Sequence, residues 1–181
     1  MLEYVESRNC FSNKECDSLL KKYKKTKWKM HEWHSSKEGI LKPKKNHKEL
    51  LVANIEREDG EFIINKLQPF VLNYLKKHNL NLSVITKFSN IRLNKYPKNS
   101  MMLSHVDHIQ TLFDGTERGI PVLSIIGVLN DDFKGGEFFI RKKEFKLNKG
   151  DVIIFPSIFI FPHEVKKILK KERYSFVLWA Y

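Results

Sequence analysis

The stretch PVLSIIGVLNDDFKGGEFFIRKKEFKLNKGDVIIFP, residues 121–156, decides the fold that the sequence predicts. It consists of short β-type runs separated by clusters of turn residues: Asn130-Asp131-Asp132, Gly135-Gly136 and Asn148-Lys149-Gly150-Asp151. Runs of this kind are typical of short strands joined by tight connections. Similar runs precede and follow the stretch, SVITKFSNIRLNKY (83–96) and RYSFVLWAY (173–181). Five or more short strands, with no helix long enough for a βαβ unit, predict an antiparallel barrel or jelly roll.

Two helices are expected before these strands. Ser12 to Glu15 form a capping box with Phe11 and Cys16 as a hydrophobic staple, which predicts a helix over 13–24. Apolar residues at helical spacing predict a second helix over 61–79, which Pro69 should bend or divide. Between them, Trp28, Met30 and Trp33 alternate as if on a strand. The predicted class is α+β, mainly β: a single domain (1–181) with a helical and mixed support region (1–80) before a β core (82–181).

The composition indicates the compartment. A chain of 181 residues can bury one core without disulfides, so Cys10 and Cys16 are expected to be reduced thiols. There is no apolar run of about 18 residues and no signal peptide pattern at the N-terminus, MLEYVESRNCF. We therefore expect a soluble, cytoplasmic protein that does not contact a membrane.

The net charge of +12 leaves two interpretations open. A basic surface can attract nucleic acid or another acidic partner. Only six of the 33 basic residues are arginine, however, and the chain is rich in Asn, Ile and Phe, so an AT-rich coding bias could also load a solvated surface with lysine.

His105 and Asp107, in SHVDHIQ (104–110), are candidate metal ligands. On a strand, residues i and i+2 point to the same face, so both side chains can bind one ion. His163, in the strand-forming stretch FPSIFIFPHEVKK, is the candidate third ligand. Two imidazoles and a carboxylate form the facial triad of non-haem Fe(II) oxygenases. The other histidines are expected in solvated or helix-capping positions, with His108 kept as a possible support for the site; they are His31, His34, His47, His78 and His108.

Arg173 is a candidate anchor for a carboxylate, because a guanidinium group matches a carboxylate with two parallel hydrogen bonds. An Fe(II) oxygenase that uses 2-oxoglutarate needs such a fixed cation for the far end of that diacid. By strand alternation Arg173 shares its face with Ser175, Val177 and Trp179, so Ser175 and Trp179 are expected to line the same pocket.

From Phe88 to Tyr181 the sequence resembles the prolyl hydroxylase branch of the 2-oxoglutarate/Fe(II)-dependent dioxygenases, and the oxygen-sensing type more than the collagen type. The resemblance rests on the order and spacing of several pieces: Tyr96 before HVD (105–107), VLND (128–131) before GGE (135–137), Gly150-Asp151 before VIIFP, PHEV (162–165), and Arg173 with Trp179 six residues on.

The resemblance implies a double-stranded β-helix in which His105, Asp107 and His163 bind iron and Arg173 binds the C5 carboxylate of 2-oxoglutarate. It further implies that Tyr96 lines the cosubstrate pocket and that Trp179 lies near the iron. Ser124 stands where collagen-type members often place a threonine that supports the cosubstrate. The implied reaction hydroxylates a prolyl residue of a protein or peptide, with Fe(II), 2-oxoglutarate, O2 and ascorbate as reductant, and releases succinate and CO2.

The sequence departs from the family at Gly127 and Val128, where oxygen-sensing members carry an aromatic pair. A tyrosine contact to the cosubstrate is therefore missing unless Tyr96 or Ser124 compensates.

Two alternative functions remain open. The first is demethylation of nucleic acid by the same iron chemistry, although that branch usually carries a second arginine where this chain has Trp179. The second is a barrel that binds without catalysis, which the intact triad and Arg173 argue against.

Overall fold

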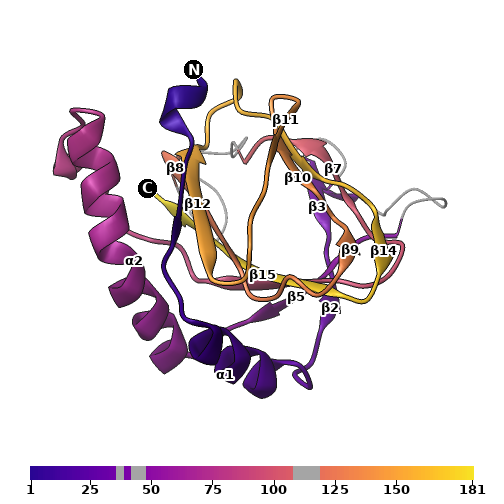
Figure 1. Cartoon of the computed structure of the whole chain (residues 1–181). Coiled ribbons are helices and arrows are strands. Elements are labelled where there is room, and N and C mark those ends of the chain that lie inside the picture. Colours follow the sequence, from indigo (N-terminus) through magenta and orange to yellow (C-terminus); the bar gives the residue numbers. More distant parts are fainter. Residues whose placement is uncertain (36–38, 42–47, 108–118) are drawn as a thin grey trace.

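The fold is known from a computed structural model, which describes residues 1–35, 39–41, 48–107 and 119–181. Two antiparallel sheets face each other, and two helices cover the outer face of the larger one (Figure 1). The larger sheet has seven strands in the order β1 (Glu6–Asn9), β12 (Asp151–Pro156), β8 (Leu123–Val128), β15 (Arg173–Ala180), β6 (Arg92–Tyr96), β5 (Leu51–Asn54) and β2 (Lys29–Met30). The predicted jelly roll is confirmed.

The smaller sheet has four strands in the order β11 (Lys143–Phe145), β10 (Phe138–Ile140), β13 (His163–Val165) and β7 (Met102–His105). Two further pairs are β14 (Ile168–Lys170) with β9 (Lys134–Gly135), and β3 (Trp33–Ser35) with β4 (Gly39–Leu41). Short 3₁₀ turns lie at Leu2–Tyr4 and Leu82–Val84. Within the smaller sheet, β10 and β11 are joined by a tight turn at Arg141 and Lys142, which both have positive φ.

Strand alternation divides the core into two layers. On β15, Tyr174, Phe176, Leu178 and Ala180 belong to the layer between the large sheet and the helices. The alternate positions Val177 and Trp179 belong to the layer between the two sheets. The period of two along a strand therefore assigns every second residue of β15 to the interior of the barrel, together with the polar positions Arg173 and Ser175.

The first helix, α1 (Asn13–Tyr23), is confirmed with its capping box. The Ser12 hydroxyl accepts a hydrogen bond from the Glu15 N–H at 3.3 Å, and the Ser12 N–H donates to the Glu15 carboxylate at 2.7 Å. Cys16 and Phe11 are both buried, as a staple requires, and both cysteines are free thiols. Two orphan donors at the helix start are thereby satisfied.

The second helix, α2 (Arg57–Lys77), begins four residues before the predicted start at 61 and passes through Pro69 as one helix. The apolar period could not show its first turn, because that turn is polar. Glu58 and Asp59 lie there and are favoured by the helix dipole. Among the described residues, no helix is long and apolar enough to cross a membrane.

The support region contributes more to the sheet than the sequence suggests. The strands β1, β2 and β5 all come from the first 54 residues and belong to the large sheet, where β1 pairs with β12 and β5 pairs with β6. The expected order of helices first and barrel afterwards is therefore wrong for these strands. They are short and polar on their exposed face, so their alternation is weak in the sequence.

The histidines outside the triad have three outcomes. The expectation of a solvated or capping position is wrong for His31, which is buried with its Nδ1 3.7 Å from a carboxylate oxygen of the buried Glu49. His78 is the C-cap residue of α2, and its Nε2 lies 2.6 Å from the Glu6 carboxylate. His47 and His108, and the side chain of His34, lie outside the described residues.

Candidate active site

Two adjacent strands of the small sheet bring the three candidate metal ligands together. β7 and β13 are antiparallel with His105 opposite His163, so the two imidazoles project from the same face with ring centroids 4.3 Å apart. Asp107 follows β7 by two residues. One ligand atom from each of the three side chains can be chosen so that all lie within 4.8 Å of one another. The strand register therefore brings Asp107 and His163, which are 56 residues apart in sequence, into the same group.

Both imidazoles contact a backbone carbonyl through Nδ1. His105 Nδ1 lies 2.8 Å from the carbonyl oxygen of Leu103, and His163 Nδ1 lies 3.3 Å from that of Phe161. Since a carbonyl can only accept, each Nδ1 carries a proton. Each Nε2 lies 3.6 Å from a different oxygen of Asp107. A backbone contact of this kind fixes the tautomer that a metal-binding histidine needs.

The electrostatics of the site favour a cation. Burial alone would raise the pKa of Asp107, but the charge of His163, the hydrogen bond and charge of His105 and the hydroxyl of Ser124 hold the pKa of Asp107 well below its usual range. Burial lowers the pKa of His163 to about 4, against the opposing attraction of Asp107. At neutral pH the site thus holds a carboxylate beside a neutral imidazole, and no proton must leave either group when a cation binds.

A pair of hydroxyl groups supports Asp107 from the large sheet. Ser124 on β8 donates a hydrogen bond to Asp107 Oδ2 at 2.6 Å, and its oxygen lies 2.7 Å from that of Ser157. Both serines are buried. The resemblance implies a cosubstrate contact for Ser124, whereas the contact that the structure gives it is with a candidate metal ligand. Ser157 directly follows β12 and belongs to no recognisable motif, so the sequence alone did not identify it.

Strands β6 and β15 form the wall opposite the triad. They pair with Arg173 opposite Tyr96, Ser175 opposite Asn94 and Val177 opposite Arg92. These side chains and Trp179 line one cavity together with His105, Asp107 and His163. The structure therefore brings the predicted residues Tyr96, Arg173, Ser175 and Trp179 to the same cavity as the metal ligands.

The Arg173 side chain fits the role of a carboxylate anchor. It is 2% exposed, and its guanidinium lies over the rings of Tyr96 and Phe133 at 5.1 and 5.9 Å. One of its terminal nitrogens donates to the Ser175 hydroxyl at 3.0 Å. No carboxylate of the described residues forms an ion pair with it. A buried cation without a counter-ion is costly, and an anionic ligand would remove that cost.

Two motifs from the sequence hold Arg173 in place rather than touch the cavity. The Asn130 amide donates to the Glu172 carbonyl oxygen at 2.8 Å, and its oxygen accepts from the Tyr174 N–H at 2.7 Å. Asn130 thus binds the backbone on both sides of Arg173. Gly136 has a φ of +72°, and a Cβ there would lie 2.4 Å from Ile168 and 3.3 Å from the Arg173 side chain. The VLND and GGE pieces therefore fix the start of β15.

The departure at Gly127 and Val128 has a structural explanation. Gly127 lies opposite Phe176, and a Cβ at Gly127 would lie 2.1 Å from that ring. The ring of Phe176 fills the space that a side chain on β8 would take, and it does so in the layer toward the helices. Val128 points to the interior and lines a groove that also contains Arg173. Val128 has no hydroxyl group to offer to Arg173. The hydroxyl that contacts Arg173 belongs to Ser175.

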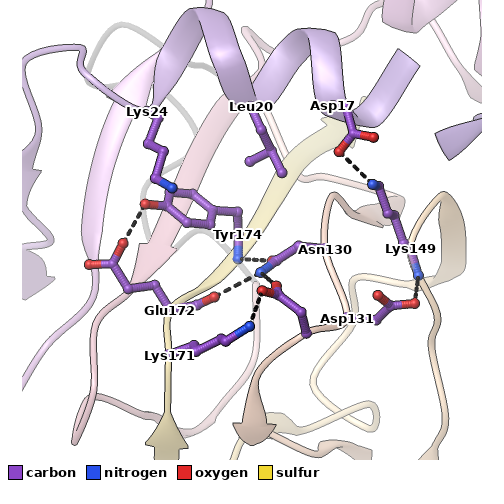
Figure 2. A pocket seen from close by; sticks show the side chains of 10 residues that line it. Asp17, Leu20, Lys24, Asn130, Asp131, Lys149, Lys171, Glu172 and Tyr174 are labelled. Atoms are coloured by element: carbon purple, nitrogen blue, oxygen red, sulfur yellow. Dashed lines mark hydrogen bonds and ion pairs between the residues drawn. The ribbon is translucent and has the colours of Figure 1, made fainter. Parts of the chain in front are cut away.

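A larger depression of about 640 Å³ lies between α1 and the start of β15 (Figure 2). Several of its polar groups are paired with one another: Lys149 with Asp17 at 2.5 Å, Lys171 with Asp132 at 2.8 Å, and the Tyr174 hydroxyl with Glu172 at 2.5 Å (Figure 2). The Lys149–Asp17 pair joins α1 to the barrel. By contrast, Arg173 in the small cavity beside the triad has no carboxylate partner among the described residues.

Arg92 and Asn94 line the cavity but were not singled out in the sequence. They alternate with Tyr96 on β6, so the parity that predicts Ser175 and Trp179 from Arg173 would have found them too. Arg92 donates through Nε to the Asn94 side-chain oxygen at 3.1 Å, and its guanidinium lies 5.2 Å from the centre of the Trp179 ring. The wall thus carries two arginines.

Comparison with solved structures shows the same fold. The viral collagen prolyl hydroxylase of Paramecium bursaria Chlorella virus 1 superposes with a TM-score of 0.66 at 18% identity, over 98% of this chain and 94% of that one. A prolyl hydroxylase of Trichoplax adhaerens, solved with a peptide of the hypoxia inducible factor, superposes with a TM-score of 0.69 at 20% identity, over 99% and 85%. These similarities concern the fold alone.

Sequence comparison identifies the family. A PKHD-type hydroxylase of Prochlorococcus marinus strain AS9601 is 32% identical over 88 residues, 46% of this chain and 39% of that protein. Another, from strain MIT 9312, is 28% identical over 141 residues, 74% of this chain and 61% of that protein. The chain therefore spans less than two thirds of the length of these relatives. The profile of the 2OG-Fe(II) oxygenase superfamily matches residues 91–181, half of the chain, which includes every ligand described above. The chain belongs to the 2OG-Fe(II) oxygenase superfamily.

Proposed function

We propose that this chain is a 2-oxoglutarate- and Fe(II)-dependent dioxygenase that hydroxylates prolyl residues in a protein or peptide. The buried guanidinium of Arg173 is the observation that carries this proposal. It lines the same cavity as His105, Asp107 and His163, and it has no carboxylate partner among the described residues. A cavity with a cation site on one wall and a free guanidinium on the other fits a ligand that chelates at one end and carries a carboxylate at the other.

Each residue has a role that its contacts support. His105 and His163 would offer their Nε2 atoms and Asp107 its carboxylate, so these three would hold Fe(II). Arg173 would bind the C5 carboxylate of 2-oxoglutarate, with Tyr96 and Phe133 covering the guanidinium faces and excluding water. With Fe(II) and O2 bound, oxidation of 2-oxoglutarate to succinate and CO2 places one oxygen atom in succinate and the other in a substrate C–H bond. Ascorbate would keep the iron reduced.

The substrate class rests on the relatives. The named structures of similar fold are prolyl hydroxylases, and one of them holds a peptide. The cavity adds that the wall beside the triad ends in Trp179, an aromatic ring of the kind that packs against a proline ring. A prolyl residue in a peptide is therefore the substrate we propose. Trp179 takes the position of the second arginine of the demethylase branch, and this favours a peptide over a nucleic acid.

The test is succinate formation from 2-oxoglutarate by the purified chain with Fe(II) and ascorbate, alone and with a panel of proline-rich peptides. We expect turnover that rises with a peptide and disappears in His163→Ala. The matched control is Arg57→Gln on the exposed start of α2, which should behave as the unchanged protein. Absence of turnover, together with absence of Fe(II) and 2-oxoglutarate binding in calorimetry, would contradict the proposal. Stimulation by a methylated oligonucleotide alone would transfer it to nucleic acid.

A further inference from the structure

The second arginine of the cavity wall has no function in the chemistry described so far. Arg92 and Arg173 are both on the interior face, on the paired strands β6 and β15. Arg92 lies opposite Val177, four residues along β15 from Arg173, which corresponds to about 13 Å of strand. The two guanidiniums therefore occupy different ends of the wall.

The electrostatic neighbours of the two arginines also differ. The pKa of Arg173 is lowered by burial and opposed only by Tyr96. The pKa of Arg92 is likewise lowered by burial, but it is opposed by both Tyr96 and Asp107. Arg92 is thus within the electrostatic range of the metal ligands. It also lines the same cavity as His105, Asp107 and His163.

The hydrogen bond that Arg92 forms with the described residues uses only its Nε donor. Its Nε is used by the Asn94 side chain at 3.1 Å, which fixes the plane of the guanidinium, and one face is covered by Trp179. Among the described residues, no carboxylate forms an ion pair with it. Two terminal nitrogens, held in a fixed plane beside a ring, are the geometry that binds a carboxylate with two parallel hydrogen bonds.

Trp179 supplies an independent observation at the same place. Its Nε1–H is buried and finds no acceptor among the described residues, although the ring lines the cavity. A buried donor without a partner is rare in folded proteins and costs free energy. Arg92 and Trp179 together therefore present donors that lack an acceptor beside the metal site.

We infer that Arg92 and Trp179, with Asn94 as the positioning residue, form a subsite for a carboxylate of the substrate. This inference rests on the proposed oxygenase function and specifies its substrate class. The carboxylate lies next to the carbon that is hydroxylated, because Arg92 and the triad line one cavity. Two sources share this chemistry: an acidic side chain beside the target proline, or the α-carboxylate of a C-terminal proline.

The test compares peptides that differ in one charge. One pair carries Glu or Gln directly after a central proline, with both ends blocked. A second pair ends in proline, as the free acid or as the amide. We expect the unchanged protein to prefer the charged member of one pair by about tenfold or more in kcat/KM, as the loss of a charge-assisted hydrogen bond implies. The pair that shows this preference identifies the source of the carboxylate.

Variants assign the preference to Arg92. In Arg92→Gln the ratio of kcat/KM between the charged and uncharged peptides should fall to about one. Arg92→Glu should favour a third peptide with Lys in place of Glu, which a variant that merely misfolds cannot do. Arg57→Gln, which removes an exposed arginine from α2, should keep the preference of the unchanged protein.

The outcomes separate this inference from the proposed function. If the unchanged protein forms succinate with a peptide but does not distinguish the charged from the uncharged members, the subsite is wrong and the oxygenase stands. If Arg92→Gln raises the KM for 2-oxoglutarate and keeps the peptide preference, the guanidinium serves the cosubstrate and the inference is overturned. If no 2-oxoglutarate is consumed under any condition, the proposed function itself fails.

Discussion

The carboxylate of Asp107 has a different neighbour on each oxygen. Oδ1 faces His105, while Oδ2 faces His163 and accepts the hydrogen bond of Ser124. Such a carboxylate cannot rotate without losing a contact. The serine hydroxyl therefore sets which lone pairs of Asp107 point to a bound cation. Residues that contact a metal-coordinating side chain affect metal affinity almost as strongly as that side chain itself.

Removal of that hydroxyl should weaken metal binding. In Ser124→Ala we expect the affinity for Mn(II), a redox-stable substitute for Fe(II), to fall about 10- to 100-fold, because Asp107 loses its buried donor. Calorimetric titration of the two proteins measures this change. Ser157→Ala, which leaves the Ser124 contact to Asp107 in place, should show a smaller loss. Equal affinities in Ser124→Ala and the unchanged protein would contradict the expected role.

The two thiols should resist alkylation at mildly basic pH. Burial raises the pKa of both Cys10 and Cys16 to about 11. The thiolate is the reactive form, and it is populated only above a raised pKa, so at pH 8 about 0.1% of each thiol is ionised compared with roughly a quarter of a free cysteine. We expect iodoacetamide to label the folded protein more than about tenfold slower than the urea-unfolded protein, by mass spectrometry. Similar rates would show that the helix α1 opens readily.

At the scale of elements, β8 and β15 are matched through one glycine and one ring. The Phe176 ring fills the position over Gly127, so the pair is complementary across the strands. The glycine has no positive φ in the structure, and the space alone forbids a side chain there. The departure from the aromatic pair at Gly127 is therefore compensated by Phe176, on the face away from the cavity.

Gly127→Ala should destabilise the protein by about 1–3 kcal/mol, because the new methyl group overlaps the Phe176 ring and forces the core to move. Urea unfolding followed by circular dichroism measures the free energy of unfolding. The double variant Gly127→Ala with Phe176→Leu should lose less than the sum of the two single variants, since the shorter side chain makes room. Additive losses would indicate that the two residues do not compete for this space.

Much of this element arrangement could be predicted from the sequence, and the reasons are local. The capping box predicts α1, and strand parity predicts that Arg173, Ser175 and Trp179 share an interior face. The polar first turn of α2 and the short strands β1, β2 and β5 carry little periodicity, so their positions depend on tertiary pairing. The HVD and PHEV pieces indicate the three ligands. The contacts of Ser157 and Arg92 required the register of strands that are far apart in sequence.

At the scale of the whole molecule, ligand binding should stabilise the fold, since the three candidate metal ligands and Arg173 come from both sheets. Mn(II) and 2-oxoglutarate, each at about 100 times its dissociation constant, should together add about 5 kcal/mol if their effects sum, which corresponds to a rise in Tm of roughly 10–20 °C for a chain of this size. Differential scanning calorimetry measures it. In Asp107→Ala the Tm should not rise, whichever ligand is added first. An equal rise in that variant would contradict the proposed metal site.

The candidate metal ligands and the proposed carboxylate anchor lie on opposite sheets: His105 and His163 on β7 and β13, and Arg173 on β15. The layer between the two sheets also contains apolar side chains such as Phe155, whose ring packs edge-on against His163 with centroids 4.9 Å apart. The thickness of this hydrophobic layer therefore sets the length of a ligand that could bind both walls at once. A change in its thickness would select among oxo-diacids by carbon number, without any change in the residues that bind them.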